Sequence, residues 1–208
     1  MPLESEKVTA KMRDTTVCIL AGGSGRRMGG QKCLQFLMGK RLIDHAISVA
    51  EEVKRRGQCS ALVVSCGDNE LSLNGTETLK DVDGQGPMAG LYSCLLAYGR
   101  TLIFPCDMPF LTADFLLFLL ERAAGHDITV CRLAGFVQPQ VGIYSAGCLS
   151  RVKELIRAGT YSLFKLTRDG KLNVRIVDEE EFFHIGDPDK IFFNINTSEE
   201  LEKARQNA

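Results

Sequence analysis

The chain has 208 residues, of which 45% are hydrophobic and 25% are charged, and its formal net charge is −1. This composition is typical of an ordinary soluble globular protein with one sizeable core, and it excludes a protein that binds nucleic acid through a global basic field. No stretch approaches the ~20 apolar residues of a membrane helix, so we expect neither nucleic acid nor a membrane as a partner.

Residues 1–14 are polar and lack the apolar run of a signal peptide, so we expect a disordered lead-in followed by one folded domain over residues 15–208. The chain has eight cysteines but no C-x-x-C pair, and most of them lie in apolar runs such as VCIL and ITVCRL. Free thiols in such runs behave as small hydrophobic side chains and are typical of a reducing compartment. The sequence therefore predicts a cytoplasmic protein without a zinc site.

Short apolar runs alternate with helical patterns along the rest of the chain. The expected strands are 16–20, 61–66, 101–107, 127–133, 138–146 and 173–178, and the expected helices are 41–56, 88–99, 113–125, about 148–158, and 197–206. Apolar strands that alternate with helices predict an α/β fold, with a mainly parallel twisted sheet and helices on both faces. Right-handed crossovers place the carboxyl ends of parallel strands along one edge, where ligands bind.

The first expected strand leads into LAGGSGRRMGGQK, residues 20–32, a glycine-rich loop that ends in basic residues. Met28 stands where a dinucleotide fingerprint has its third glycine, and Lys32 is followed by Cys33 where a Walker loop has Ser or Thr. Glycines still let backbone N–H groups approach a ligand closely, and Arg27 and Lys32 match the charge of phosphates. We interpret the loop as a nucleotide site rather than as a solvated surface turn.

Three later segments strengthen this interpretation. In IFPCDMPFL, Asp107 follows a buried strand, where a carboxylate can hold Mg²⁺ that bridges phosphates; a turn-forming aspartate is the alternative. In LKDVDGQGPMAGL, a glycine loop precedes Pro87, which suits the first turn of a helix near a ligand; a plain tight connection fits this segment equally well. In FFNINTSEEL, Asn194 and Asn196 alternate along an expected strand and so share one face.

Taken together, LAGGSGRRMGGQK, GKRL, GPMAGL, PCDMPFL and NINTSEEL resemble the molybdenum cofactor guanylyltransferases of the nucleotidyltransferase superfamily, in order and in spacing, over about residues 16–206. The resemblance implies a Rossmann-like nucleotidyltransferase fold. It also implies transfer of GMP from GTP to the terminal phosphate of molybdopterin, with Mg²⁺ as cofactor and pyrophosphate as the second product. Cofactor-handling proteins and recipient molybdoenzymes are the further partners that it implies.

The resemblance also implies roles for individual residues. The nucleotide-binding positions are Leu20, Ala21, Gly22, Gly23, Lys32, Ser65, Asp81 and Asp107. The catalytic positions are Arg27, Lys32 and Asp107, and Asp107 is the implied Mg²⁺ ligand. Asn194 and Asn196 match positions on the pterin side.

Several alternatives stay open at this point. The acid of the nucleoside pocket is either Asp81 or Asp83. A sibling enzyme would transfer a cytidylyl group to molybdopterin, or a nucleotidyl group to a sugar phosphate or phospholactate. A non-catalytic nucleotide-binding regulator is the alternative outside enzymes, and the failed glycine fingerprint disfavours a nicotinamide-dependent oxidoreductase.

Overall fold

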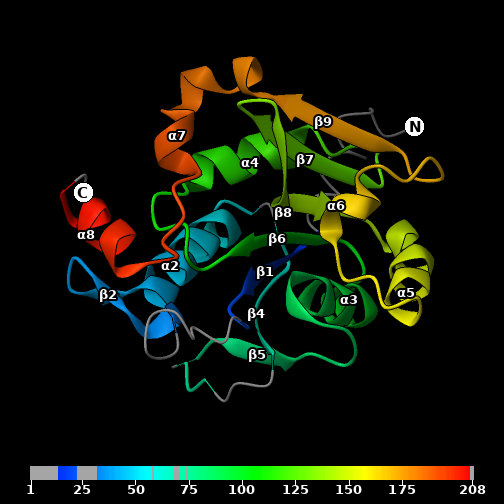
Figure 1. Ribbon diagram of the computed structural model, residues 1–208, viewed down its shortest axis with the longest axis horizontal. Coiled ribbons are helices and arrows are strands. Elements are labelled where there is room, and N and C mark those ends of the chain that lie inside the picture. The colour runs from blue at the N-terminus through cyan, green and yellow to red at the C-terminus, as the bar shows by residue number, and fades with distance from the viewer. Residues whose placement is uncertain (1–13, 23–31, 58, 68–70, 74, 207–208) are drawn as a thin grey trace.

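The computed structural model describes residues 14–22, 32–57, 59–67, 71–73 and 75–206 (Figure 1). The expected lead-in over residues 1–14 therefore lies, apart from Asp14, outside the described residues.

Seven strands of the described chain form one sheet, in the order β5-β4-β1-β6-β8-β7-β9. Their bounds are β1 Thr16–Leu20, β4 Ala61–Gly67, β5 Glu77–Lys80, β6 Thr101–Pro105, β7 Ile128–Leu133, β8 Phe136–Tyr144 and β9 Val174–Asp178. A separate hairpin joins β2 (Phe36–Leu37) to β3 (Lys40–Arg41). The α-helices are α2 Leu42–Arg55, α3 Gly86–Tyr98, α4 Ala113–Glu121, α5 Leu149–Arg157, α6 Leu163–Leu166, α7 Pro188–Ile191 and α8 Ser198–Gln206.

The prediction of a mainly parallel sheet is confirmed, with β8 as the exception. Strands β5, β4, β1 and β6 are parallel neighbours, and so are β7 and β9, whereas β8 runs antiparallel to both β6 and β7. The reversal comes from a two-residue turn, because Ala134 and Gly135 both have positive φ, at 47° and 81°. Two such residues form the tight turn that connects antiparallel strands without a crossover helix. The carboxyl end of β8 therefore points away from the edge where the parallel strands end.

Both faces of the sheet are covered by helices, as predicted. On β1, Val17 and Ile19 belong to a core cluster that includes residues of α2 and α4, whereas Cys18 and Leu20 belong to a cluster with residues of α3 and α5. Successive side chains of a strand point to opposite faces, so the all-apolar run of β1 fills two cores at once. Figure 1 shows α3 and α5 on one side of the sheet and α2 and α4 on the other.

The helix signals of the sequence match the structure closely. Pro87 lies in the first turn of α3, and Gly99 ends that helix with a φ of 77°. Before α8, the Glu200 N–H donates to Thr197 Oγ1 at 3.2 Å, and the Thr197 N–H donates to Glu200 Oε2 at 2.9 Å. This is the reciprocal pair of a capping box, as the spacing of these two residues indicates. Within the described residues, no helix combines the length and the apolarity that crossing a membrane requires.

The expected strand through Asn194 and Asn196 is wrong, because this segment has no regular secondary structure. The Ile195 N–H donates to the Asp107 carbonyl oxygen at 2.9 Å, so the segment is fixed to the turn after β6 rather than paired with a sheet edge. In Figure 1 it forms the connection from α7 to α8. The sequence analysis also missed β5, whose residues ETLK are mostly exposed and have no apolar run.

Candidate functional site

A pocket lies at the carboxyl ends of the parallel strands, where the predicted nucleotide residues meet. It is lined by Leu20, Gly22, Ser65, Asp81, Gly86, Pro87, Pro105, Asp107 and Gln140. These residues come from the ends of β1 and β6, from β4 and β8, from the residue after β5 and from the start of α3. Segments that are far apart in the sequence are thus brought to one place by the order of the strands.

The first loop leaves β1 between two neighbouring strands. The Ala21 N–H donates to the Ser65 carbonyl oxygen at 2.8 Å, and the Cys106 N–H donates to the Leu20 carbonyl oxygen at 3.1 Å. A Cβ added at Gly22 would lie 3.1 Å from the Gly67 backbone nitrogen, so this position needs a glycine for close backbone packing. Gly23 and Arg27, both predicted site residues, lie outside the described residues.

The structure places Asp81, and not Asp83, in the pocket. The buried Ser65 hydroxyl donates to Asp81 Oδ1 at 2.8 Å, which orients that carboxylate. The Asp83 carboxylate instead accepts from the N–H of Gly84 at 2.8 Å, and Asp83 is absent from the pocket lining. Of the two aspartates, Asp81 is therefore the one that lines this pocket, although the sequence spacing fits both.

Gly90 of α3 explains why the GPMAGL segment has a glycine facing the sheet. A Cβ at this position would lie 2.6 Å from Ser65 Oγ and 2.8 Å from Leu20 Cδ2. The helix therefore packs against β1 and β4 at a distance that only a glycine at position 90 permits. The same helix supports the Asp81 turn, because Ser93 Oγ accepts from the Val82 N–H at 2.9 Å.

Lys32 joins Asp107, near the middle of the chain, to Asn196, near its carboxyl-terminal end. Its ammonium group donates to the Asp107 carboxylate and to Asn196 Oδ1, the latter at 2.7 Å. The side chains of Lys32 and Asp107 are 15% and 17% exposed, so their ion pair is only partly screened by water. Backbone contact reinforces the cluster through the Ile195–Asp107 hydrogen bond described above. The structure thus brings together Lys32 and Asp107, both expected at the nucleotide, with Asn196, expected on the pterin side.

Asp107 is suited to hold a divalent cation together with a ligand. Its Oδ1 atom is buried and has no hydrogen-bond partner among the described residues, while Oδ2 accepts from Lys32. Within the described part of the chain, no group of three or more His, Cys, Asp or Glu side chains has the geometry of a metal site. A single carboxylate supplemented by phosphate oxygens is a common way to bind Mg²⁺, so the donor set fits a cation that arrives with a nucleotide.

Asn194 does not share the position of Asn196. Its Oδ1 atom is buried without a hydrogen-bond partner among the described residues, and the residue is not part of the pocket lining. The strand that would have placed both amides on one face is absent, so the shared face predicted for them is wrong.

Gln140 is a pocket residue that the sequence analysis missed. It lies on β8, whose antiparallel direction brings its exposed amino-terminal half beside Pro105 and Asp107. The signal in the sequence was the pair of polar residues Gln138 and Gln140, which lie in the first half of an otherwise largely apolar strand. Its position could not be inferred without the hairpin that reverses β8.

The cysteines near the pocket are neutral thiols. All eight cysteines of the chain are free and buried. Burial raises the pKa of the Cys66 thiol to about 11, with smaller contributions from Cys33 and Asp81. Burial also raises the pKa of the Cys106 thiol, and the neighbouring Asp107 carboxylate adds to this shift. A thiolate nucleophile is therefore disfavoured at neutral pH, and the prediction of free thiols is confirmed.

The chain matches one protein family over most of its length. Residues 17–174 match the family described as "MobA-like NTP transferase domain". A probable molybdenum cofactor guanylyltransferase of Pelotomaculum thermopropionicum is 32% identical over 201 residues, which cover 93% of each chain.

Two solved structures extend the comparison. The molybdopterin-guanine dinucleotide biosynthesis protein A of Archaeoglobus fulgidus superposes with a TM-score of 0.79 at 26% identity, over 92% of this chain and 97% of that one. A Mycobacterium tuberculosis protein solved in complex with manganese has a TM-score of 0.64 at 18% identity, over 93% and 98% of the two chains. The latter likeness shows the fold alone.

Proposed function

The chain belongs to the MobA-like NTP transferase domain family and is a nucleotidyltransferase, and on this basis we propose that it transfers GMP from GTP to the terminal phosphate of molybdopterin. The observation that carries the proposal is the junction of two regions at Asp107. The pocket with Ser65 and Asp81 lies on one side of Asp107. On the other side, Lys32 hydrogen-bonds to both Asp107 and Asn196 and so fixes the segment that contains Asn196. Two substrates can therefore meet at this carboxylate.

The proposed reaction needs no general base. The acceptor is a phosphate monoester, which is largely doubly charged near pH 7 because its second pKa is about 6. One of its oxygens forms a bond to the α-phosphorus of GTP, and the bond from that phosphorus to the bridging oxygen of the β-phosphate breaks, which releases pyrophosphate. This chemistry is consistent with the pocket lining, in which no histidine occurs among the described residues.

The chief barrier is repulsion between the two anionic substrates. Two unit charges about 4 Å apart repel each other by about 4 kcal/mol at an effective dielectric constant of 20. The Lys32 ammonium lies beside Asp107 in a partly buried position, so its charge would offset this repulsion. We assign the same role to Arg27, which lies outside the described residues. Catalysis then rests on positioning and electrostatics, as in phosphoryl transfer generally.

We propose Mg²⁺ as the cofactor, held by Asp107 together with the phosphates of GTP. The unpartnered Oδ1 atom of Asp107 supports this assignment, and the manganese complex of a protein with the same fold is consistent with a divalent cation. A bound Mg²⁺ supplies neutralisation of the charge that develops on the triphosphate.

The nucleoside of GTP is assigned to the pocket between β1, β4 and α3. Leu20 and Gly22 line this pocket. Because the Ala21 N–H and the Leu20 carbonyl oxygen already bond to neighbouring strands, we assign the hydrogen bonds to the base to the peptide groups of Gly22. The Asp81 carboxylate, which is oriented by the Ser65 hydroxyl, can accept a hydrogen bond from a ribose hydroxyl or a guanine N–H group. We place the reaction in the cytosol, because eight free buried cysteines suit a reducing compartment.

The proposal is tested by calorimetric titration of GTP, CTP, UTP and ATP, each with Mg²⁺, into the wild-type protein and Asp107→Asn. We expect GTP to bind preferentially and to bind more weakly to the variant. Adding molybdopterin to the GTP mixture should release pyrophosphate, which a coupled phosphate assay measures. Preference for another nucleotide would transfer the assignment to a sibling transferase, and nucleotide binding without pyrophosphate release would indicate a non-catalytic regulator.

A further inference from the structure

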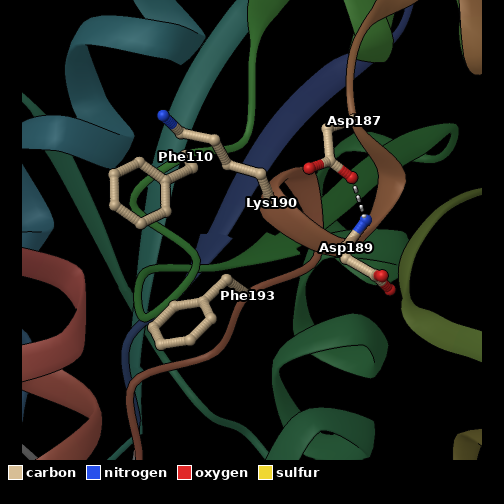
Figure 2. A pocket seen from close by; sticks show the side chains of 5 residues that line it. All are labelled: Phe110, Asp187, Asp189, Lys190 and Phe193. Atoms are coloured by element: carbon tan, nitrogen blue, oxygen red, sulfur yellow. Dashed lines mark hydrogen bonds between the residues drawn. The ribbon is translucent and has the colours of Figure 1, made fainter. Parts of the chain in front are cut away.

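A second pocket lies beside the turn that follows Asp107, and we call it the aromatic pocket. It is lined by Phe110, Asp187, Asp189, Lys190 and Phe193, and its volume is about 350 Å³ (Figure 2). Phe110 comes from the turn after β6, whereas the other residues come from α7 and its two flanks. The volume lies within the range of small-molecule sites, which is roughly 300–1,000 Å³.

Two phenylalanine rings, which pack against the core on one side, form a wall of the aromatic pocket. The rings of Phe110 and Phe193 have their centroids 6.0 Å apart at an interplanar angle of 56°. Both rings pack against a small core cluster that includes Leu37, Ile195 and Leu201, yet both are only partly buried. The core therefore fixes the two rings while part of their surface lines the cavity, and such surfaces favour contact with another flat ring.

The opposite side of the pocket carries a carboxylate. One oxygen of Asp187 accepts from the Asp189 N–H at 3.1 Å, and the other has no hydrogen-bond partner among the described residues. Figure 2 shows Asp187 facing the space that Phe110 and Phe193 also border, whereas the Asp189 carboxylate turns away from it. The Lys190 ammonium lies 5.1 Å from the centroid of the Phe110 ring. The pocket thus pairs ring faces with an oriented hydrogen-bond acceptor.

The aromatic pocket is attached to the catalytic cluster at two points. Phe110 follows Asp107 by three residues, so their Cα atoms are at most about 11 Å apart. Phe193 precedes Ile195, whose N–H donates to the Asp107 carbonyl oxygen, and Asn196, whose amide accepts from Lys32. None of its lining residues belongs to the pocket formed by Leu20, Ser65 and Asp81. A ligand here would therefore approach Asp107 from outside the proposed nucleotide pocket.

We propose that the aromatic pocket binds the pterin ring of the acceptor, while the acceptor phosphate lies at Lys32 and Asp107; this inference rests on the proposed function. A pterin carries a flat 2-amino-4-oxopyrimidine ring, with an amino group and a ring N–H that donate side by side. Phe110 and Phe193 contact the ring, and Asp187 accepts from these donors. Guanine has the same donor edge, but its proposed site lies on the other side of Asp107.

The test measures pterin and GTP binding separately. The probe is 6-hydroxymethylpterin phosphate, whose fluorescence reports binding, and GTP with Mg²⁺ is titrated by calorimetry. We expect Phe110→Ala and Phe193→Ala each to weaken binding of the pterin about tenfold or more, and to leave the affinity for GTP within about twofold. Phe183→Ala is the matched control, because Phe183 is a 57% exposed phenylalanine outside the pocket. It should leave both affinities unchanged.

A second variant removes the charge and keeps the fold. Asp187→Asn retains a side chain that caps α7 equally well, and it should weaken pterin binding about tenfold because a charged acceptor is lost. Unchanged pterin affinity in Asp187→Asn and in folded phenylalanine variants would overturn the inference, while intact GTP binding and turnover would leave the proposed function standing. Loss of GTP affinity alone would show that the pocket holds guanine, which also overturns the inference. Absence of GTP binding to the wild-type protein would instead refute the proposed function.

Discussion

The two halves of the site differ in how they are built. The nucleotide half, around Ser65, Asp81 and Gly90, is formed by adjacent parallel strands and a closely packed helix. The acceptor half, around Asn196 and the aromatic pocket, is formed by turns and by a segment without regular structure. Close packing leaves the first half little freedom, because a Cβ at Gly90 would already overlap Ser65.

This difference predicts which property each substitution changes. A change in the nucleotide half should alter stability together with affinity for GTP, since the same atoms serve packing and binding. A change in the acceptor half should alter affinity for the acceptor at nearly constant stability, because its side chains are half-exposed. Lys32 and Asp107 lie between the two halves, so substitutions of these residues should lower the rate of catalysis most.

The largest effect is expected at Asp107. Asp107→Asn should keep the fold and lower kcat by about 10²–10³-fold, because the carboxylate that we assign to the cation is lost. Pyrophosphate release at saturating GTP measures the effect. Asp114→Asn is the control, since Asp114 is 69% exposed and pairs with Arg56 on the surface. Near-normal turnover of Asp107→Asn would remove this residue from the mechanism.

Lys32 should rank next. Lys32→Ala should lower kcat/KM by about 10- to 100-fold, because hydrogen bonds to charged groups contribute about 1.5–3 kcal/mol. It also deletes the link between Asp107 and Asn196, so affinities for both substrates should fall. Steady-state kinetics with each substrate varied in turn measures the two effects. Lys54→Ala, on the exposed face of α2, is the control; equal behaviour of both variants would contradict the role of Lys32.

A substitution at Gly90 tests whether packing and GTP binding are linked in the nucleotide half. Gly90→Ala should lower the free energy of unfolding by about 1–3 kcal/mol, because the new Cβ would lie 2.6 Å from Ser65 Oγ. The displaced Ser65 should weaken GTP binding at the same time. Urea unfolding and calorimetry measure the two quantities. Gly170→Ala is the control, since no heavy atom lies within 4 Å of a Cβ there. A change in stability without a change in GTP affinity would show that packing and binding are separable.

A smaller effect is expected at Ser65. Ser65→Ala removes the hydroxyl that orients Asp81, and about 1 kcal/mol of lost hydrogen bonding corresponds to about a fivefold rise in KM for GTP. The value of kcat should stay nearly constant, because the Ser65 hydroxyl donates to Asp81, whereas Asp107 Oδ2 accepts from Lys32. Ser48→Ala, on the outer face of α2, is the control. A fall in kcat with unchanged KM would place Ser65 in catalysis instead.

The smallest effect concerns pH. The pKa of Cys66 is raised to about 11 by burial, so the neutral thiol stabilises the fold fully below about pH 9, and this contribution is lost as the pH rises toward 11. Cys66→Ala should therefore lose stability less steeply between pH 9 and pH 11 than the wild type. Urea unfolding at pH 8, 9, 10 and 11 provides the comparison. Parallel curves for the two proteins would contradict the buried-thiol assignment.

Local signals predicted the parts of the molecule that local chemistry determines. The apolar run of β1, the capping box of α8 and the position of Asp107 after a buried strand all follow from short stretches of sequence. The direction of β8 did not, because it depends on two positive φ angles at Ala134 and Gly135, where the sequence lacks the usual Asn or Asp.

The same distinction between local signals and contacts distant in sequence applies to the site. Ser65 and Asp107 lie near the ends of expected strands, so the strand order brings them together, whereas Asp81 follows β5, which was not expected. Gln140 and Phe193 were missed because their places depend on contacts between segments distant in sequence. Asn194 was misplaced for the same reason, since the backbone hydrogen bond of Ile195 to Asp107 replaced the expected strand pairing.

The hydrogen bond from Lys32 to Asn196 spans 164 residues of the chain. A ribosome must therefore synthesise the chain as far as Asn196 before this contact can form, whereas β1, β4 and α3 are complete much earlier. A nascent or prematurely ended chain contains the elements of the nucleotide half without the residue that completes the cluster at Asp107. Completion of the catalytic cluster consequently has to wait for the segment that immediately precedes α8.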